Sequence, residues 1–541
     1  MNRTIKKIKM GADHDNSLKD QYKMFKYYKE GMFVEVNLAE SARYRQMCLK
    51  NLKEAQFRLK KVKLVNYKGF NELSISLDND IILIAANNGY GKTGILEAIY
   101  LSLSWFYRLV YGSNQGWKFG DKYINRQASN SVMLVNLGVS VGNNKKSSDY
   151  QIDIVRSLSV SSVKSNYVDF KELAEMYQEF RDSGIAPPMF AYYSVERGKN
   201  YPDGGFTSAI ESGSDKLLDM LYPDSSLSLS SNIFASFIKW AAEIKIKKSI
   251  SGENEQSRKL KSLNEFIYHI SRSDLADEIK STLIREKEQE IKLFFGGQLT
   301  DKSPNLDRME KIVDMIFALG SDFIDDISSI QLKYDEKLES LDLVCVKRDC
   351  EISASYLSHG EKSMLSLLFD IALKLIYTCG TEDPFNGQGI VFIDEIELHL
   401  HPSWQQSLLS KLKKTFPNVK IIATTHSPNI LNTVEEQAIR KIKVKDNQFY
   451  IEIPGFSYGA KSSQVQSDIQ DVAARPDVEP VQNLVRFREM MKNNQYDTPE
   501  AQDLLEKILQ WGDAHDPDVT KLKIDLELRM KRNAKKGSKE Q

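Results

Sequence analysis

Three short apolar runs predict strands that are buried on both faces of a parallel sheet. They are IILIA at residues 81–85, IVFI at residues 390–393 and VKIIA at residues 419–423. Residues 57–77 alternate in strand fashion and lead into the first of these runs. Further strands are expected on either side of a polar turn, GNNKKSSD. The fold class is therefore α/β.

Helical periodicity accounts for most of the remaining chain. One helix is expected from about Thr93 and another over residues 362–377. Residues 1–56 form a charged helical extension, which is either a docking element or a pad packed on the core. Residues 213–328 carry apolar residues at helical spacing without a sustained heptad, so a short helical insertion is expected instead of a coiled-coil arm.

The insertion separates two lobes, residues 57–212 and 329–455, and the chain closes with a helical region at residues 456–541. Three helices are expected in that last region, the first over residues 478–492. The other two begin with a capping residue followed by proline, Thr498-Pro499 and Asp516-Pro517.

Composition excludes several classes of protein. The chain has 541 residues, enough for two to four structural units, and its 74 basic and 74 acidic residues give no overall attraction to nucleic acid. Its four cysteines lack metal-binding spacing and fit a reducing compartment. No apolar run approaches the roughly 20 residues that span a bilayer, and no secretory signal is visible. We expect a cytoplasmic protein without a membrane partner.

A phosphate-binding loop follows the first buried run. The segment AANNGYGKT, ending at Thr93, has the strand, glycine-rich turn and helix of a P-loop, with Ala86 in place of the first glycine. Successive N–H groups and the helix N-terminus would bind ATP phosphates. Lys92 would reach the β- and γ-phosphates, and the Thr93 hydroxyl would bind Mg²⁺. The expected nucleotide contacts are Asn87, Asn88, Gly89, Tyr90, Gly91, Lys92 and Thr93.

Acidic and imidazole groups follow the other two buried runs. Asp394 and Glu395 lie at the carboxyl end of the second run, where ligands bind in open α/β sheets. Asp394 would hold Mg²⁺, and Glu395 would orient or deprotonate the attacking water. His426, in a Thr-Thr-His-Ser turn, follows what is expected to be the next strand of the sheet. It would hydrogen-bond the γ-phosphate or the attacking water.

The segment LSHGE, residues 357–361, precedes a long helix. Ser358, Gly360 and the helix N-terminus would make a second anion site, and Glu361 is expected beside the nucleotide as well; alone, the segment would be an ordinary capped helix start. With the other motifs it resembles ATPases of the ABC class, including the SMC and RecF branches. The resemblance implies a head with an antiparallel β layer, and two chains that sandwich two ATP molecules. It also implies that Lys68 contacts nucleotide.

The helical region at residues 456–541 indicates which branch of these ATPases the chain resembles. The motifs are similar to those of OLD-family ATPases, which carry a Toprim nuclease domain after the core. Here Asp516-x-Asp518 follows a helix, and Asp516 is explained as a cap, so no nuclease site is expected. The chain therefore resembles the PtuA-like ATPases of Septu and retron anti-phage systems. That resemblance implies an HNH nuclease (PtuB-like) as partner, and in retrons a reverse transcriptase with its DNA–RNA hybrid.

Two functions compete for a chain with these motifs. The first is an ATP-hydrolysing scaffold that restrains and regulates the HNH nuclease. The alternative is a RecF-like DNA-repair ATPase acting on DNA ends or gaps, whose DNA binding would weaken steeply with salt.

Overall fold

The computed structural model describes residues 3–110, 119–125, 132–143, 146–158, 164–195, 241, 244, 306–335, 340–379, 384–513 and 515–537. The chain divides into two compact units, Met1–Gly459 and Ala460–Gln541, which are treated separately below. Most of the predicted insertion at residues 213–328 lies outside the described residues. None of the described helices combines the length and apolar character needed to cross a membrane.

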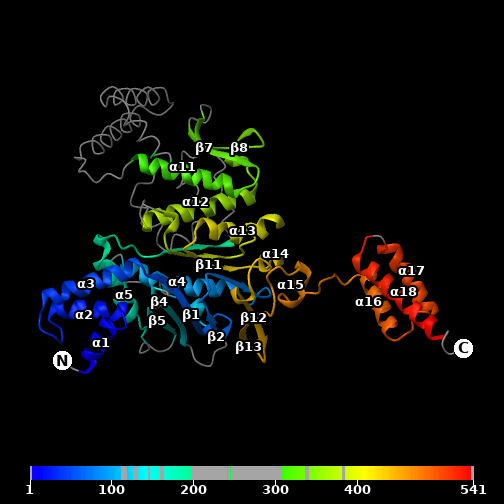
Figure 1. Cartoon of the computed structure of the whole chain (residues 1–541), viewed down its shortest axis with the longest axis horizontal. Coiled ribbons are helices and arrows are strands. Elements are labelled where there is room, and N and C mark those ends of the chain that lie inside the picture. The colour runs from blue at the N-terminus through cyan, green and yellow to red at the C-terminus, as the bar shows by residue number, and fades with distance from the viewer. Residues whose placement is uncertain are drawn as a thin grey trace. The chain divides into compact units, whose positions relative to one another are not determined.

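A six-stranded sheet forms the centre of the first unit, and Figure 1 shows helices on both of its faces. Its order is β13-β12-β3-β11-β10-β6, and all neighbours run parallel except β12 and β13. The three predicted apolar strands are confirmed as β3, β10 and β11, side by side. The strands are β3 (Ile81–Ala85), β6 (Met189–Tyr193), β10 (Gly389–Ile393), β11 (Val419–Thr424), β12 (Ile439–Lys445) and β13 (Gln448–Glu452).

A second, antiparallel sheet has the order β2-β1-β4-β5. The predicted turn at residues 142–149 is wrong, because the hairpin pairs as far as Asn143 with Lys146 and its turn is shorter. The mostly buried helix α4 (Lys92–Val110) contacts both sheets. The strands are β1 (Gln56–Tyr67), β2 (Phe70–Ser76), β4 (Val132–Asn143) and β5 (Lys146–Ser157).

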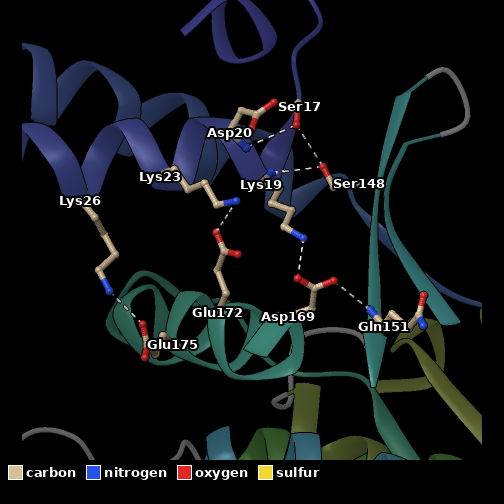
Figure 2. Close-up of polar contacts among 10 residues, drawn as sticks. All are labelled: Ser17, Lys19, Asp20, Lys23, Lys26, Ser148, Gln151, Asp169, Glu172 and Glu175. Atoms are coloured by element: carbon tan, nitrogen blue, oxygen red, sulfur yellow. Dashed lines mark hydrogen bonds and ion pairs between the residues drawn. The ribbon is translucent and has the colours of Figure 1, made fainter. Parts of the chain in front are cut away.

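The N-terminal helices pack on the core of the first unit. Of the two interpretations of residues 1–56, a docking element or a pad on the core, the structure supports the second. The buried side chains of these helices, such as Tyr22 and Tyr44, belong to the same hydrophobic cluster as α4 and the antiparallel sheet. Lysines on α2 also face acids on α5, as Figure 2 shows, with Lys19 2.7 Å from Asp169. The helices are α1 (Arg3–Asp13), α2 (Leu18–Glu30), α3 (Leu38–Lys53) and α5 (Val168–Glu179).

A third sheet and further helices complete the first unit. The sheet has the order β7-β8-β9, and β7 begins inside the range for which the sequence predicts helix. The predicted helix over residues 362–377 is confirmed as α12, which is longer at both ends and contacts β6. The elements are α11 (Leu306–Phe323), β7 (Ile327–Asp335), β8 (Ser340–Lys347), β9 (Cys350–Ser353), α12 (His359–Cys379), α13 (Pro402–Thr415) and α14 (Pro428–Leu431).

The second unit has its own apolar core, built by α16, α17 and α18. Thr498 accepts a hydrogen bond from Ala501 N, and Asp516 accepts one from Asp518 N, so both predicted caps are confirmed. Arg475 donates hydrogen bonds to Asp516 and lowers the pKa of that carboxyl to about 2. The helices are α15 (Ser462–Asp468), α16 (Glu479–Lys492), α17 (Pro499–Gly512) and α18 (Pro517–Gly537).

Candidate nucleotide site

The loop between β3 and α4 has the backbone conformation that a phosphate-binding turn requires. Gly89 and Gly91 have φ of 81° and 80°, in the left-handed region that favours glycine. A Cβ on Gly91 would also lie 2.7 Å from the Phe70 ring. Ala86, which replaces the first glycine of the pattern, does not adopt a positive φ, so its Cβ is tolerated.

The rim of this loop is open to solvent. Asn87, Asn88 and Gly89 are exposed, so their backbone groups are accessible to a ligand. Tyr90 is half-buried and packs edge-on against Phe449 of β13, with ring centroids 5.8 Å apart. This aromatic contact holds the loop against the edge of the central sheet.

The Lys92 side chain points back into the loop and contacts His426. Its Nζ donates to Ala86 O at 2.9 Å and lies 2.6 Å from His426 Nε2. Because an ammonium group only donates, Nε2 must accept, and the imidazole is neutral. Burial lowers the pKa of Lys92; burial and the adjacent Lys92 charge lower the pKa of His426.

Asp394 joins three elements at the carboxyl edge of the sheet. The side chain is buried, and its carboxylate accepts hydrogen bonds from Thr93 Oγ1 at 2.7 Å and from Thr424 Oγ1 at 2.5 Å. Thr424 Oγ1 in turn accepts from Glu395 N at 2.7 Å. Sequence reasoning missed Thr424, although the Thr-Thr-His-Ser turn pointed to this position. The network fixes the hydroxyl and carboxylate predicted to bind Mg²⁺ beside one another.

Glu397 connects the turn after β10 to the turn after β11. Its Oε1 accepts the His426 N–H at 2.5 Å. Its Oε2 is buried and has no hydrogen-bond partner in the described part of the chain. Sequence reasoning missed this residue as well, because no motif assigns it an individual role.

The segment before α12 is a capped helix start. Ser358 N donates to Glu361 Oε2 at 2.8 Å, and Ser358 Oγ accepts from Glu361 N at 3.3 Å, which is a capping box. Burial raises the pKa of Glu361, but hydrogen bonds from Lys347 and Ser358 outweigh it and lower the pKa overall. Gly360 packs against His399 O, where a Cβ would lie 2.5 Å away.

Within the described residues, no hydrogen bond joins Ser358, Gly360 or Glu361 to the P-loop of the same chain. The structure therefore brings Lys92, Thr93, Asp394 and His426 together and leaves the LSHGE segment as a separate group.

Lys68 lies beside the start of α4. It has φ of 50°, its ammonium group pairs with Glu97, and it lies 5.1 Å from the centroid of the Tyr123 ring. A Cβ on Gly94 would be 3.0 Å from Lys68 Cδ, so the side chain lies along the first turn of the helix. Its contact with nucleotide stays a prediction.

Comparison with known proteins identifies the family. A model described as "AAA ATPase domain" matches residues 58–431, more than half of the chain. The chain belongs to this AAA ATPase family. Membership implies nucleotide binding, in agreement with the P-loop geometry.

Two curated relatives match this AAA ATPase along nearly its whole length. Retron Vc95 probable ATPase of Vibrio cholerae is 28% identical and covers 92% of this chain and 96% of its own. Retron Ec83 probable ATPase of Escherichia coli is 27% identical and covers 98% of this chain and 97% of its own. Septu protein PtuA of Bacillus thuringiensis is 29% identical over 141 residues, 25% of this chain and 36% of that protein. The predicted resemblance to retron and Septu ATPases is confirmed.

The donor set of this AAA ATPase fits ATP with Mg²⁺. Mg²⁺ is usually held by one or two protein oxygens together with substrate phosphates, and Thr93 and Asp394 present two such oxygens. The described residues contain no cluster of three or more His, Cys, Asp or Glu side chains that could hold a metal. The orphaned carboxylate oxygen of Glu397 adds a buried acceptor for water near the same site.

Proposed function

We propose that this chain binds and hydrolyses ATP with Mg²⁺ through the site around Lys92. Lys92 would exchange its bonds to the loop carbonyls and His426 for bonds to the β- and γ-phosphates. Thr93 and Asp394 would hold Mg²⁺, which when bound neutralises phosphate charge. Glu395 would take the proton of the attacking water, and His426 would hydrogen-bond the γ-phosphate.

One observation carries this proposal. Side chains from three separate segments, α4, the turn after β10 and the end of β11, meet in the continuous network of Thr93, Asp394 and Thr424. Asp394 is held by two hydroxyl donors at 2.7 and 2.5 Å. A buried carboxylate is costly unless its oxygens are hydrogen-bonded, and this one is bonded by the hydroxyl that a P-loop offers to Mg²⁺.

Two variants test the ATPase. Lys92→Ala is expected to weaken ATP binding at least about tenfold, because a hydrogen bond to a charged group contributes about 1.5–3 kcal/mol. Glu395→Gln is expected to keep ATP binding and lower kcat about 100-fold or more. The exposed Glu435, which caps no helix through its side chain, supplies the control Glu435→Gln. Equal turnover in Glu395→Gln and the control would refute the assignment of the base.

We also propose that the ATPase belongs to an anti-phage defence system, in which a dimer that sandwiches two ATP molecules scaffolds and regulates an HNH nuclease. The support is the similarity to retron ATPases, which extends over 92% and 98% of this chain. A reverse transcriptase with its DNA–RNA hybrid would be a further partner. We expect no nuclease site at Asp516 and Asp518, because both carboxylates pair with Arg475.

Affinity purification from native cells tests this role, with bound proteins and nucleic acids identified. Recovery of an HNH nuclease supports the defence function. Recovery of DNA with repair proteins alone would favour the RecF-like alternative. Deletion of residues 478–541, which removes the helices of the second core, is expected to abolish nuclease recovery while ATP turnover persists. A nuclease retained by the truncated chain would refute the tail as its binding region.

A further inference from the structure

Three acids among the described residues have a buried carboxylate oxygen without a hydrogen bond: Glu172, Glu397 and Glu452. Those oxygens of Glu172 and Glu452 lie within 4 Å of Lys23 and Lys443, whereas no described cation pairs with Glu397. Oε1 accepts the His426 backbone N–H at 2.5 Å, which ties the turn after β10 to the turn after β11. Oε2 is buried, and no described residue donates a hydrogen bond to it. The fold therefore satisfies one oxygen of this carboxylate and leaves the other without a hydrogen bond.

The unused oxygen needs an explanation. A buried polar atom without a partner costs about 1–3 kcal/mol, and a charged one costs more. The tether to His426 N–H requires one acceptor only, so a neutral amide would serve it equally well. An acid at this position is therefore explained by a donor that reaches Oε2 when the site operates.

The neighbours of Glu397 indicate what that donor is. Its charge acts on both Lys92 and His426, opposing the effect of burial on their pKa values. Glu397 therefore lies within electrostatic reach of the phosphate-binding lysine. Phosphate oxygens only accept hydrogen bonds and repel a carboxylate, so they are not its partner. Water is the donor that such a site offers.

We propose that Glu397 is a positioning residue for ATP hydrolysis. Oε1 fixes the turn that carries His426, and Oε2 accepts a hydrogen bond from a water molecule held beside His426 and the γ-phosphate. In the reaction the oxygen of the attacking water bonds to the γ-phosphorus, the bond to the β–γ bridging oxygen breaks, and Glu395 takes the proton. Glu397 keeps its charge throughout. This inference rests on the proposed ATPase function.

Two variants of Glu397 distinguish the role of Oε1, which binds the His426 N–H, from the proposed role of Oε2, which binds water. Glu397→Gln keeps an oxygen for the His426 N–H and replaces Oε2 by a donor, whereas Glu397→Ala removes both. We expect Glu397→Gln to lower kcat about tenfold or more while KM for ATP stays within about threefold, and Glu397→Ala to lower kcat further. The control is Glu435→Gln, and ATP binding measured by titration shows that each variant is folded.

The outcomes distinguish this inference from the proposed function. Turnover of Glu397→Gln within about twofold of the control, with Glu395→Gln inactive, overturns the role of Glu397 and leaves the ATPase in place. An increase in KM equal to the loss in kcat/KM, with kcat unchanged, also overturns it, because the residue would then act on binding alone. Absence of ATP turnover in the unmodified chain overturns both proposals.

Discussion

Gly360→Ala examines the contact between helix α12 and the turn that carries the acidic residues. Gly360 is the second residue of α12, and the Cβ of an alanine would lie 2.5 Å from His399 O and 3.5 Å from the carbonyl carbon. Non-bonded carbon and oxygen atoms rarely approach so closely, so helix and turn must separate by roughly 1 Å. The obstacle is backbone, which cannot rotate away as a flexible side chain would.

The expected magnitude follows from opposing terms. Overpacking of this kind costs about 1–3 kcal/mol of the free energy of unfolding. Alanine also raises the free energy of unfolding by up to about 1 kcal/mol, because it has a higher helix propensity than glycine and lowers the entropy of the unfolded chain. We therefore expect a net destabilisation of about 1–2 kcal/mol. The turn that must move contains Asp394, Glu395 and Glu397, and a displacement near 1 Å at a reacting site can lower kcat about 100-fold.

Urea unfolding and steady-state ATP turnover measure the two effects. Gly455→Ala is the matched control, because a Cβ at Gly455 has no atom within 4 Å and its φ is not in the left-handed region. The control is expected to change stability by less than about 0.5 kcal/mol. If Gly360→Ala matched Gly455→Ala in both assays, the contact with His399 O would not constrain the turn, and the reasoning would be refuted.

Two further predictions concern buried charges. Lys374 and Asp370 form an ion pair at 2.7 Å, with side chains 6% and 4% exposed. Asp370→Asn should lower the free energy of unfolding by about 3–5 kcal/mol. Asp370→Leu with Lys374→Met and Tyr193→Phe, which also removes the hydroxyl that Asp370 binds, should restore most of it; a triple variant as unstable as the single one would contradict this. Burial lowers the pKa of Lys420 to about 8. The unfolded lysine, with a pKa of about 10.4, binds more protons, so stability should rise between about pH 8 and 10.4. Urea midpoints at two pH values, compared with Lys420→Met, check this; an equal rise in both proteins would contradict it.

Two parts of the site could be predicted from the sequence: the local P-loop, and the approach of Asp394 and His426 to it at the ends of neighbouring parallel strands. A strand, two glycines with positive φ and a helix starting at Lys92 are a local arrangement, so the P-loop could be predicted together with its departure at Ala86. The sequence also predicts that β3, β10 and β11 lie in one sheet, because apolar runs of this kind are typical of parallel strands buried on both faces.

Side-chain contacts between distant segments outside these motifs could not be predicted. The pairing of Lys19 with Asp169 joins residues 150 positions apart, and each residue alone is typical of a solvated helix face. The pairing of Lys347 with Glu361 depends on how β8 lies beside the start of α12. The predicted hairpin turn is too long because small polar residues are equally compatible with a strand end; Ser148 is buried there and accepts a hydrogen bond from Lys19 N at 3.1 Å.

Helix α12 touches the acidic turn directly at Gly360 and is linked to it a second time through Tyr193 of β6. Near its N-terminus, Gly360 touches His399 O. Eleven residues after the helix begins, Asp370 accepts a hydrogen bond from Tyr193 Oη at 2.5 Å, and Tyr193 O accepts the Asp394 N–H at 2.8 Å. We expect these two links to carry a displacement of the first turn of α12 to Asp394. In the proposed dimer the partner's nucleotide would press on that turn, so substitutions at Gly360 and Asp370 should change kcat more than KM.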